Sequence, residues 1–178
     1  DVIVAADLGQ GADWMEVHPL LVEPFVVAAP RGMVAPGADL RAQLLEAPFI
    51  HYTSQHMMGR MIEAHLLRHR ITLPHRFELD SYHAIMAMVA AGAGWTIITP
   101  LGFMAAHRFR DAAEMHRLPT APLARTIALF ARRGILGTMP EDIAARMRPL
   151  LRDLAVGPAT DRVPWLIEDF RVLGPQVP

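Results

Sequence analysis

The chain has 178 residues, of which 52% are hydrophobic, so it is long enough to bury one substantial core or the cores of two small lobes. Its formal net charge is −1, and its basic residues are spread along the sequence, which argues against a nucleic-acid-binding surface on this chain. It has no cysteine, which excludes a disulfide framework, a cysteine zinc site and a thiol nucleophile, and which is compatible with a cytoplasmic location.

The first three predicted elements are strands. Residues 1–6 form a short apolar run rich in β-branched side chains, which predicts a buried strand of a parallel sheet. Residues 15–21 and 24–29 are two further strand candidates, and a Pro-Arg-Gly turn follows the second of them.

Helices are predicted in the middle of the chain. Residues 39–46 begin at a good N-cap residue and place leucines at helical spacing. Residues 49–52 predict a short strand. Residues 54–69 predict an amphipathic helix, and we expect Thr53 or Ser54 to cap its N-terminus.

A strand, a helix and another strand follow. Residues 76–79 predict the first strand, and residues 82–91 are almost wholly apolar, which predicts a buried helix. Gly92 and Gly94 are expected to let the chain reverse tightly into a strand at residues 95–99.

The last regular elements are a strand at residues 125–131 and a helix at residues 140–154. Acidic residues at the start of this helix and arginines toward its end agree with the helix dipole. Alternating strands and helices indicate an α/β protein with a largely parallel sheet. Residues 157–178 show no regular pattern, and we expect them to form a loosely docked extension.

A membrane-spanning segment is not predicted. The most apolar stretch, residues 85–101, is interrupted by Gly92, Gly94 and Pro100. The first residues also lack the charged and apolar regions of a signal peptide. They look like the middle of a fold, so we expect an upstream segment to precede them in a longer polypeptide.

Several segments together resemble the regulatory domain of LysR-type transcriptional regulators. They are DVIVAAD at the start, VHPLLVEPFVVAAPRG, MVAAGAGWTIITP, and ALFARRG followed by PEDIAARMRPLLRDL. The resemblance covers residues 1–154. It implies a type 2 periplasmic-binding-protein-like α/β fold, in which two Rossmann-like lobes are joined by crossing strands and an effector binds between them.

The domain organisation is predicted from this resemblance and from composition. Residues 1–29 would belong to lobe one, residues 30–126 to lobe two, residues 127–156 to the return strand and closing helix of lobe one, and residues 157–178 to a C-terminal extension. The resemblance implies that lobe one is N-terminally incomplete here. DNA contact would belong to a missing N-terminal winged helix-turn-helix, and association would give a homodimer or homotetramer.

Thr53, Ser54 and Gln55 form the strongest candidate ligand site. A short strand leads there into a helix whose free backbone N–H groups and partial positive charge suit a carboxylate. From the residues alone, a capping role is the more frequent one for Thr53 and Ser54. The family resemblance favours a binding role instead. We therefore expect a small organic anion as the effector and no cofactor.

Other residues near strand ends complete the expected site. By the same topology, the crevice would also be lined by Ala6, Asp7, Leu8, Thr99 and Pro100. Asp7 is equally well explained as a turn residue. His51 and His56 flank the anion site as hydrogen-bond donors, although a capping or core role is at least as frequent for them.

Catalytic and metal sites are not indicated. Neither Ser54 nor Ser81 lies in a G-x-S-x-G motif. His65 and His69 have the spacing that places two imidazoles on one helix face, but a third ligand is not marked. We predict no catalytic turnover and no metal requirement. Two other functions remain open: a solute-binding receptor of a transport system, and an enzyme on the same scaffold, such as a tetrapyrrole-synthesis deaminase or a prephenate-handling enzyme.

Overall fold

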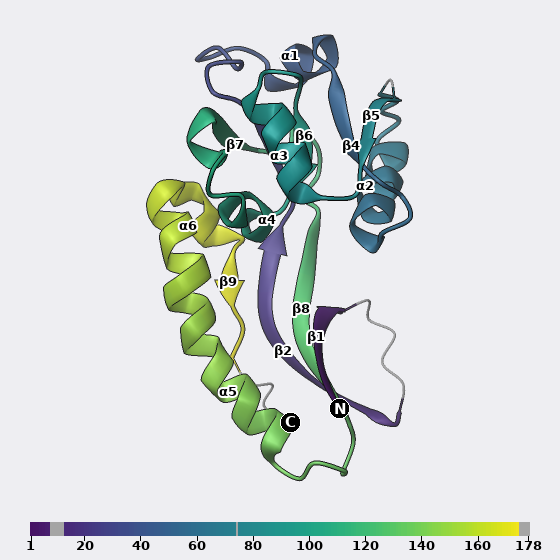
Figure 1. Cartoon of the computed structure of the whole chain (residues 1–178), viewed down its shortest axis with the longest axis vertical. Helices are drawn as coiled ribbons and strands as arrows, with labels where there is room; N and C mark the ends of the chain where they lie inside the picture. The colour runs from purple at the N-terminus through teal and green to yellow at the C-terminus, as the bar shows by residue number, and fades with distance from the viewer. Residues whose placement is uncertain (8–12, 74, 175–178) are drawn as a thin grey trace. The chain divides into compact units, whose positions relative to one another are not determined.

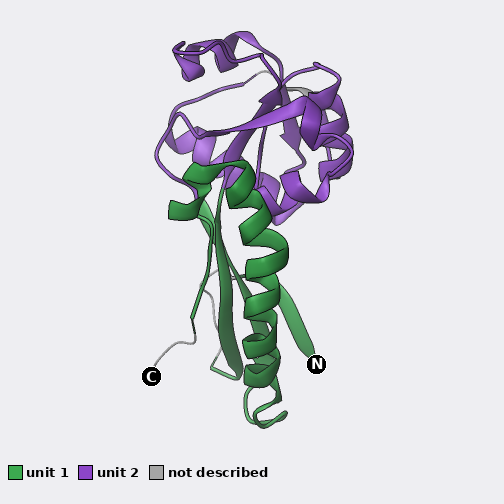
Figure 2. Cartoon of the chain, turned by 90° about the vertical axis from the view of Figure 1, so that its left-hand side faces the viewer, with its two compact units in different colours: residues 1–24, 124–178 green, residues 25–123 purple. Residues whose placement is uncertain are grey.

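The computed structural model describes residues 1–7, 13–73 and 75–174. The chain forms two compact units, of which unit 1 consists of Asp1–Pro24 and Ala124–Pro178 and unit 2 of Phe25–Leu123 (Figure 2). The chain therefore leaves unit 1 once and returns to it once. The lobe boundaries expected from the sequence, after residues 29 and 126, lie a few residues later than these unit boundaries. Both unit boundaries lie within apolar strand sequence, where the composition does not change.

Unit 1 contains a four-stranded sheet in the order β1-β8-β2-β9 (Figure 1). Its strands are β1 (Val2–Asp7), β2 (Met15–Pro24), β8 (Ala124–Arg132) and β9 (Arg171–Val172). Each of the pairings is antiparallel, so the expectation of a largely parallel sheet is wrong for this unit. The reason is topological: β2 leads out of the unit and β8 leads back into it, and adjacent strands of that kind run in opposite directions.

The strand predicted at residues 1–6 is present as β1, but it is not buried. β1 is an edge strand that pairs with β8 on one side, and Ile3 and Val4 are 60% and 46% exposed. The apolar composition of this strand therefore reflects neither a central position nor burial within this chain.

A long helical segment packs on the sheet of unit 1. It consists of α5 (Met139–Leu151), the π-helix η2 (Arg152–Val156), α6 (Gly157–Arg162) and the 3₁₀-helix η3 (Pro164–Glu168). The buried face of α5 includes Ala144 and Arg148, and the Arg148 guanidinium donates a hydrogen bond of 3.0 Å to the carbonyl oxygen of Pro19 in β2.

Residues 159–173 are well packed, which corrects the expectation of a loosely docked extension for this part of the chain. Ala159, Leu166 and Phe170 are 0%, 0% and 1% exposed. β9 pairs with β2 at Leu21 and Val22. The composition of this segment shows no regular pattern, although the segment completes the sheet and core of unit 1.

A buried ion pair joins the two strands that connect the units. Glu23 of β2 lies directly opposite Arg125 of β8 and is fully buried. Nε and Nη2 of Arg125 both lie near Oε1 of Glu23, at 2.8 Å and 2.6 Å. The pair fixes the register of β2 and β8 at the end of unit 1 where both strands reach the boundary.

Unit 2 contains five strands with helices packed around them. The strands are β3 (Val26–Pro30), β4 (Phe49–Tyr52), β5 (His75–Leu79), β6 (Thr96–Ile98) and β7 (Ala113–Arg117). The helices are α1 (Leu40–Glu46), α2 (Met57–Arg68), α3 (Tyr82–Ala90), α4 (Pro100–Ala105) and the 3₁₀-helix η1 (Arg110–Ala112). α4, η1 and β7 were not expected from the sequence.

Strand directions in unit 2 are mixed. β3 pairs antiparallel with both β6 and β7, whereas β4 and β5 pair in parallel. A parallel bridge between Phe49 and Trp95 connects β4 to the start of β6. β4, β5 and β6 therefore run in the same direction, so the expectation of parallel strands is met in this part of the chain.

Gly92 and Gly94 have the predicted role in the reversal between α3 and β6. Gly92 has a φ of 78° and its N–H donates to the carbonyl of Val89 at the end of α3. A Cβ at Gly94 would collide with the carbonyl of Pro48. Glycine is therefore required at both positions, once for backbone conformation and once for close approach.

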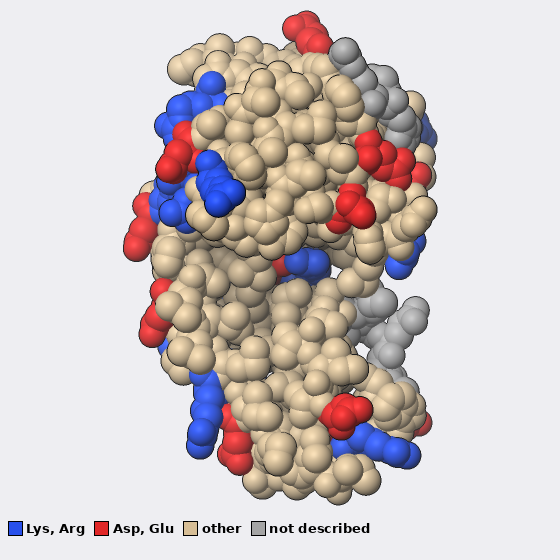
Figure 3. Space-filling model, viewed as in Figure 1, with Lys and Arg blue, Asp and Glu red and all other residues tan. Residues whose placement is uncertain are grey.

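Charged side chains of both signs are interspersed on the surface. Figure 3 shows basic side chains next to acidic ones on the face it presents, and every basic residue besides histidine is an arginine. This distribution agrees with the small net charge of −1.

Candidate functional site

The candidate site in unit 2 lies at one edge of its strands. Because β4 and β6 are parallel neighbours, their carboxyl ends reach the same edge, which places residues 53–55 near residues 99–100. The alignment is held by two hydrogen bonds of 2.8 Å: Thr96 Oγ1 donates to the carbonyl of Ile50, and Ile50 N–H donates to the carbonyl of Trp95.

The same edge is where the chain enters and leaves unit 2. Val26, at the start of β3, lies opposite Ile98 at the end of β6. The N–H of Phe25 donates to the carbonyl of Leu123 at 2.7 Å. Residues that follow β4 and β6 are thus on the side of unit 2 that is continuous with the connecting strands.

Residues 53–56 form a turn before α2, so the helix begins later than expected. The N-cap is His56 rather than Thr53 or Ser54, and it makes no side-chain capping hydrogen bond. The hydroxyl of Thr53 instead accepts from the N–H of Gln55 at 3.4 Å, and the carbonyl of Thr53 accepts from the N–H of His56 at 3.2 Å. In this turn, Thr53 therefore accepts hydrogen bonds from the backbone N–H groups of Gln55 and His56, in place of the bonds of a longer α2.

Access to this turn differs among the three predicted residues. Thr53 is buried, with its N–H donating to the carbonyl of Leu79 at 2.8 Å, whereas Ser54 and Gln55 are exposed. The first N–H groups of an α-helix have no partner within the helix. Ser54, Gln55 and the start of α2 therefore combine an exposed hydroxyl and amide with backbone donors.

Gly59 allows the turn to pack closely on α2. A Cβ at this position would collide with the carbonyl of Thr53, so the helix start and the end of β4 are in direct backbone contact. The sequence analysis did not single out this glycine. Its position inside a predicted helix, where glycine is unfavourable, was the available signal.

Arg60 adds a positive charge at the turn. Its guanidinium donates to the carbonyl of Gln55 at 2.8 Å and to that of Ser54 at 3.4 Å. Arg60 was not expected at the site from the sequence. A basic residue in the first turn of a helix opposes the helix dipole, which was the signal that Arg60 has another role.

His51 lies next to the turn. It lines a cavity of about 30 Å³ together with Ser54, Glu63 and Glu78, and its ring packs edge-on against Phe49 with 4.4 Å between centroids. Two carboxylates make this cavity a poor place for an anion. The packing favours a core role for His51 and leaves the Arg60 side of the turn as the better anion site.

Thr99 and Pro100 form the start of α4. Thr99 is the N-cap, and its hydroxyl accepts from the N–H of Gly102 at 3.4 Å. Both residues are buried, and Pro100 occupies the first turn. The Thr99 hydroxyl is thus engaged in capping.

The remaining predicted residues belong to unit 1 or fall outside the description. Ala6 and Asp7 lie at the end of β1, opposite Ile127 and Thr126 of β8. They are close along β8 to Ala124, where the chain returns from unit 2. Leu8 lies outside the described residues. Six of the nine predicted residues are thus in unit 2, and only those that follow β4 and β6 are brought to one edge.

His65 and His69 are neighbours on α2, with 4.5 Å between their ring centroids. His65 is buried, and its Nε2 lies 2.8 Å from the hydroxyl of Thr120. The ranges that the structure describes hold no group of three or more metal-ligating side chains. The burial and hydrogen bond of His65 make it part of the packing of unit 2.

Among the described helices, none combines the length and apolar composition needed to span a bilayer.

Comparison with known families gives one match. The family model described as the LysR substrate binding domain matches residues 1–139. No curated protein sequence matches the chain.

Solved structures of regulatory proteins are similar in fold. A mutant of OxyR from Corynebacterium glutamicum has a TM-score of 0.66 and 21% sequence identity, with 91% of this chain and 51% of that chain covered. The CcmR regulatory domain of Synechocystis in complex with 2-PG has a TM-score of 0.67 and 20% identity, with 84% and 73% covered. The effector-binding domain of QuiR in complex with shikimate has a TM-score of 0.62 and 14% identity, with 84% and 72% covered.

These similarities establish the fold and the extent of the match. The chain has the type 2 periplasmic-binding-protein-like α/β fold, as expected. It spans about half the length of the OxyR chain.

Proposed function

Because this chain belongs to the family of LysR substrate binding domains, we propose that it senses a small organic anion and thereby controls DNA binding by a LysR-type transcriptional regulator. It acts as a binding domain and not as an enzyme. The DNA-binding part of the regulator lies outside this chain, and the regulator works in the cytoplasm as a homodimer or homotetramer.

The observation behind the anion proposal is the turn at the N-terminus of α2. Exposed Ser54 and Gln55, the unpaired N–H groups of the first helical turn and the Arg60 guanidinium all lie at one strand end. An anion there would receive charge-assisted hydrogen bonds, which are stronger than those between neutral groups. A neutral ligand would form no ion pair with the Arg60 guanidinium.

Ala6 and Asp7 would supply the second set of contacts. Both lie at the end of β1 near the return of the chain into unit 1, as Ser54 and Gln55 lie at the edge of unit 2 where the chain enters. A ligand shifts a conformational equilibrium only by its difference in affinity between the two states. This is how we expect binding to reach the DNA-binding part.

Two neighbours that were solved with an organic ligand agree with this chemistry. QuiR was solved with shikimate and CcmR with 2-PG. Shikimate is a carboxylate. A panel of shikimate, benzoate and acetate is therefore a suitable set of probes for the chain.

The experiment combines titration calorimetry with thermal unfolding. We expect the double variant Thr53→Val and Ser54→Ala to weaken binding of the best probe by about 1 to 3 kcal/mol, because charge-assisted hydrogen bonds are lost. Thr138→Val at the N-cap of α5 is the control, because it alters a comparable helix start in unit 1. It should leave the affinity unchanged.

A second variant separates the anion site from simple turn formation. We expect Arg60→Gln to weaken the same probe, and Arg152→Gln, an exposed arginine of η2, to leave it unchanged. If the double variant lowers the melting temperature while both it and Arg60→Gln keep full affinity, residues 53–60 only shape the helix start and the proposed anion site is wrong.

A further inference from the structure

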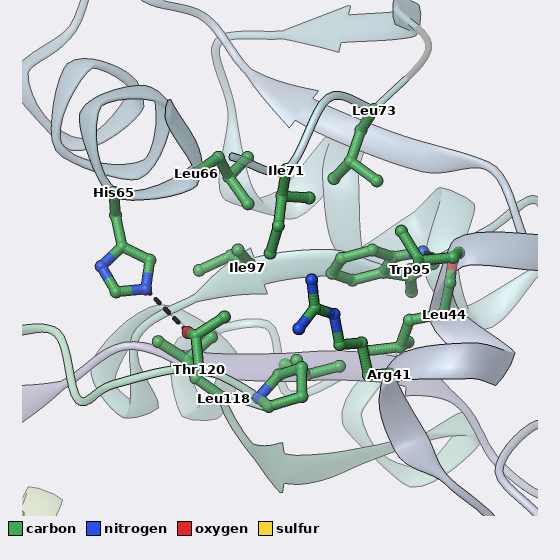
Figure 4. A pocket seen from close by; sticks show the side chains of 13 residues that line it. Arg41, Leu44, His65, Leu66, Ile71, Leu73, Trp95, Ile97, Leu118 and Thr120 are labelled. Atoms are coloured by element: carbon green, nitrogen blue, oxygen red, sulfur yellow. Dashed lines mark hydrogen bonds between the residues drawn. The ribbon is translucent and has the colours of Figure 1, made fainter. Parts of the chain in front are cut away.

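Unit 2 contains an apolar cavity that is separate from the strand-end site. It lies between α1, α2 and the strands β3 and β6, and Figure 4 shows the side chains that line it. Its volume is about 20 Å³, and it is partly open to solvent. The apolar side chains around it include Leu44, Leu66, Ile71, Leu73, Trp95 and Ile97.

One cation points into this apolar lining. Figure 4 shows the guanidinium of Arg41 directed from α1 into the space between Ile71, Ile97 and Trp95. Arg41 is exposed, and its guanidinium forms no hydrogen bond or ion pair with any residue that the structure describes. An unpaired guanidinium at the mouth of an apolar cavity favours a ligand with a carboxylate at one end.

The other polar groups of the lining are already paired. Trp95 Nε1 donates to the carbonyl of Leu44 at 2.8 Å. Nε2 of His65 lies 2.8 Å from the hydroxyl of Thr120, which itself donates to the carbonyl of Ala121 at 3.3 Å. The hydroxyl therefore accepts from His65, which assigns the proton to Nε2. Apart from Arg41, the cavity thus offers apolar contact.

We propose that this cavity binds a short-chain monocarboxylate, with its alkyl chain among the leucine, isoleucine and tryptophan side chains and its carboxylate on Arg41. The enclosed space holds little more than a water molecule, so the ligand displaces the flexible side chains at the mouth. Arg41 and Leu45 are both exposed there and are free to move outward. The proposal is independent of the strand-end anion site.

Binding is measured with butyrate, pentanoate and hexanoate, and hexanamide is the neutral comparison. We expect affinity to rise about fourfold with each methylene until the cavity is filled, because each buried CH₂ contributes a constant transfer free energy. Hexanoate should bind more tightly than hexanamide. The indole N–H signal of Trp95 in nuclear magnetic resonance spectra, identified with Trp14→Phe and Trp165→Phe variants, should shift with the same dissociation constant.

Variants locate the carboxylate. We expect Arg41→Gln to weaken hexanoate binding about tenfold and to remove the preference over hexanamide, while Arg41→Lys keeps part of both. Arg146→Gln, an exposed arginine of α5, is the charge-matched control and should have no effect.

The outcomes separate this cavity from the strand-end site. In the variant Thr53→Val with Ser54→Ala, hexanoate should still shift the Trp95 signal with the dissociation constant of the unaltered chain, because Trp95 lines the cavity and not the strand-end site. If that variant loses hexanoate while Arg41→Gln keeps it, the carboxylate binds at the strand-end site and the cavity proposal is wrong. Absence of a Trp95 shift up to the solubility limit of hexanoate overturns it equally.

Discussion

His65 shows how a histidine that suggests a metal site can instead belong to a core. It lies on the inner side of α2, is 3% exposed and forms its hydrogen bond with Thr120. Burial lowers the pKa of His65 below its ordinary value of 6.5, and the nearby His69 and Arg68 lower this pKa further. The neutral ring is therefore the form that the fold accommodates.

This predicts a dependence of stability on pH. Below about 6.5 the unfolded chain binds a proton at His65 more readily than the folded chain does, so protons favour unfolding. The contribution of His65 is fully present above this pH and is lost as the pH falls below it. We expect His65→Gln, whose amide can still donate to Thr120, to flatten the decline of the unfolding free energy between pH 7.5 and 5.5 in urea titrations.

Two comparisons make the pH prediction specific. His83→Gln replaces an exposed histidine of α3 and should leave the decline unchanged. Burial also lowers the pKa of His116, although Glu114 opposes the shift, so part of the decline should persist in His65→Gln. An identical decline in the wild type and in His65→Gln would show that His65 is not the group that titrates.

At the scale of elements, the C-terminal segment shows how strongly a short, irregular stretch can be anchored. Leu166 of η3 and Phe170, which directly precedes β9, are 0% and 1% exposed. The N–H of Leu173 donates to the carbonyl of Leu20 at 2.8 Å. β9 has two residues, so its hydrogen bonds alone are a weak attachment. Side-chain burial is therefore the main stabilising contribution.

We expect Phe170→Ala to lower the unfolding free energy by roughly 3 kcal/mol, because removing a buried aromatic ring forfeits its burial and leaves a cavity. Ile167→Ala is the control in the same segment. Its side chain is 69% exposed, so the change should stay within about 0.5 kcal/mol. Chemical denaturation measures both variants. Similar small losses for the two would restore the view that the C-terminal extension is loosely docked.

At the scale of the whole molecule, exposed apolar side chains indicate self-association. Ile3, Val4, Leu150 and Leu154 of unit 1 are between 46% and 75% exposed. Exposed apolar surface of this kind is often covered by a partner.

We therefore expect light scattering to give the mass of a homodimer or homotetramer at high protein concentration, with dissociation on dilution. Leu154→Glu and Ile3→Glu, tested separately, would show which exposed side chain takes part, because a charge at a buried contact is unfavourable. A monomer mass at the highest soluble concentration would contradict the predicted association.

The sequence by itself was sufficient for those features that depend on local patterns. Alternating apolar runs and amphipathic stretches identified most strands and helices, and the Gly92 and Gly94 pair identified the reversal between α3 and β6. The order of weak motifs identified the family and the fold, which the family match over residues 1–139 and the structural neighbours confirmed. These features could be predicted because backbone preference and periodic burial act over a few residues.

Only the tertiary structure decided strand direction, burial and the surroundings of the candidate site. Whether a strand pairs in parallel depends on its neighbour, so the antiparallel sheet of unit 1 and the exposure of β1 could not be deduced from apolar composition. Likewise, the contact of Gly59 with Thr53, the approach of Arg60 to the turn and the direction of Arg41 into the cavity depend on residues that meet through packing. Local pattern describes what a segment can form, whereas the partners available in three dimensions determine what each side chain does.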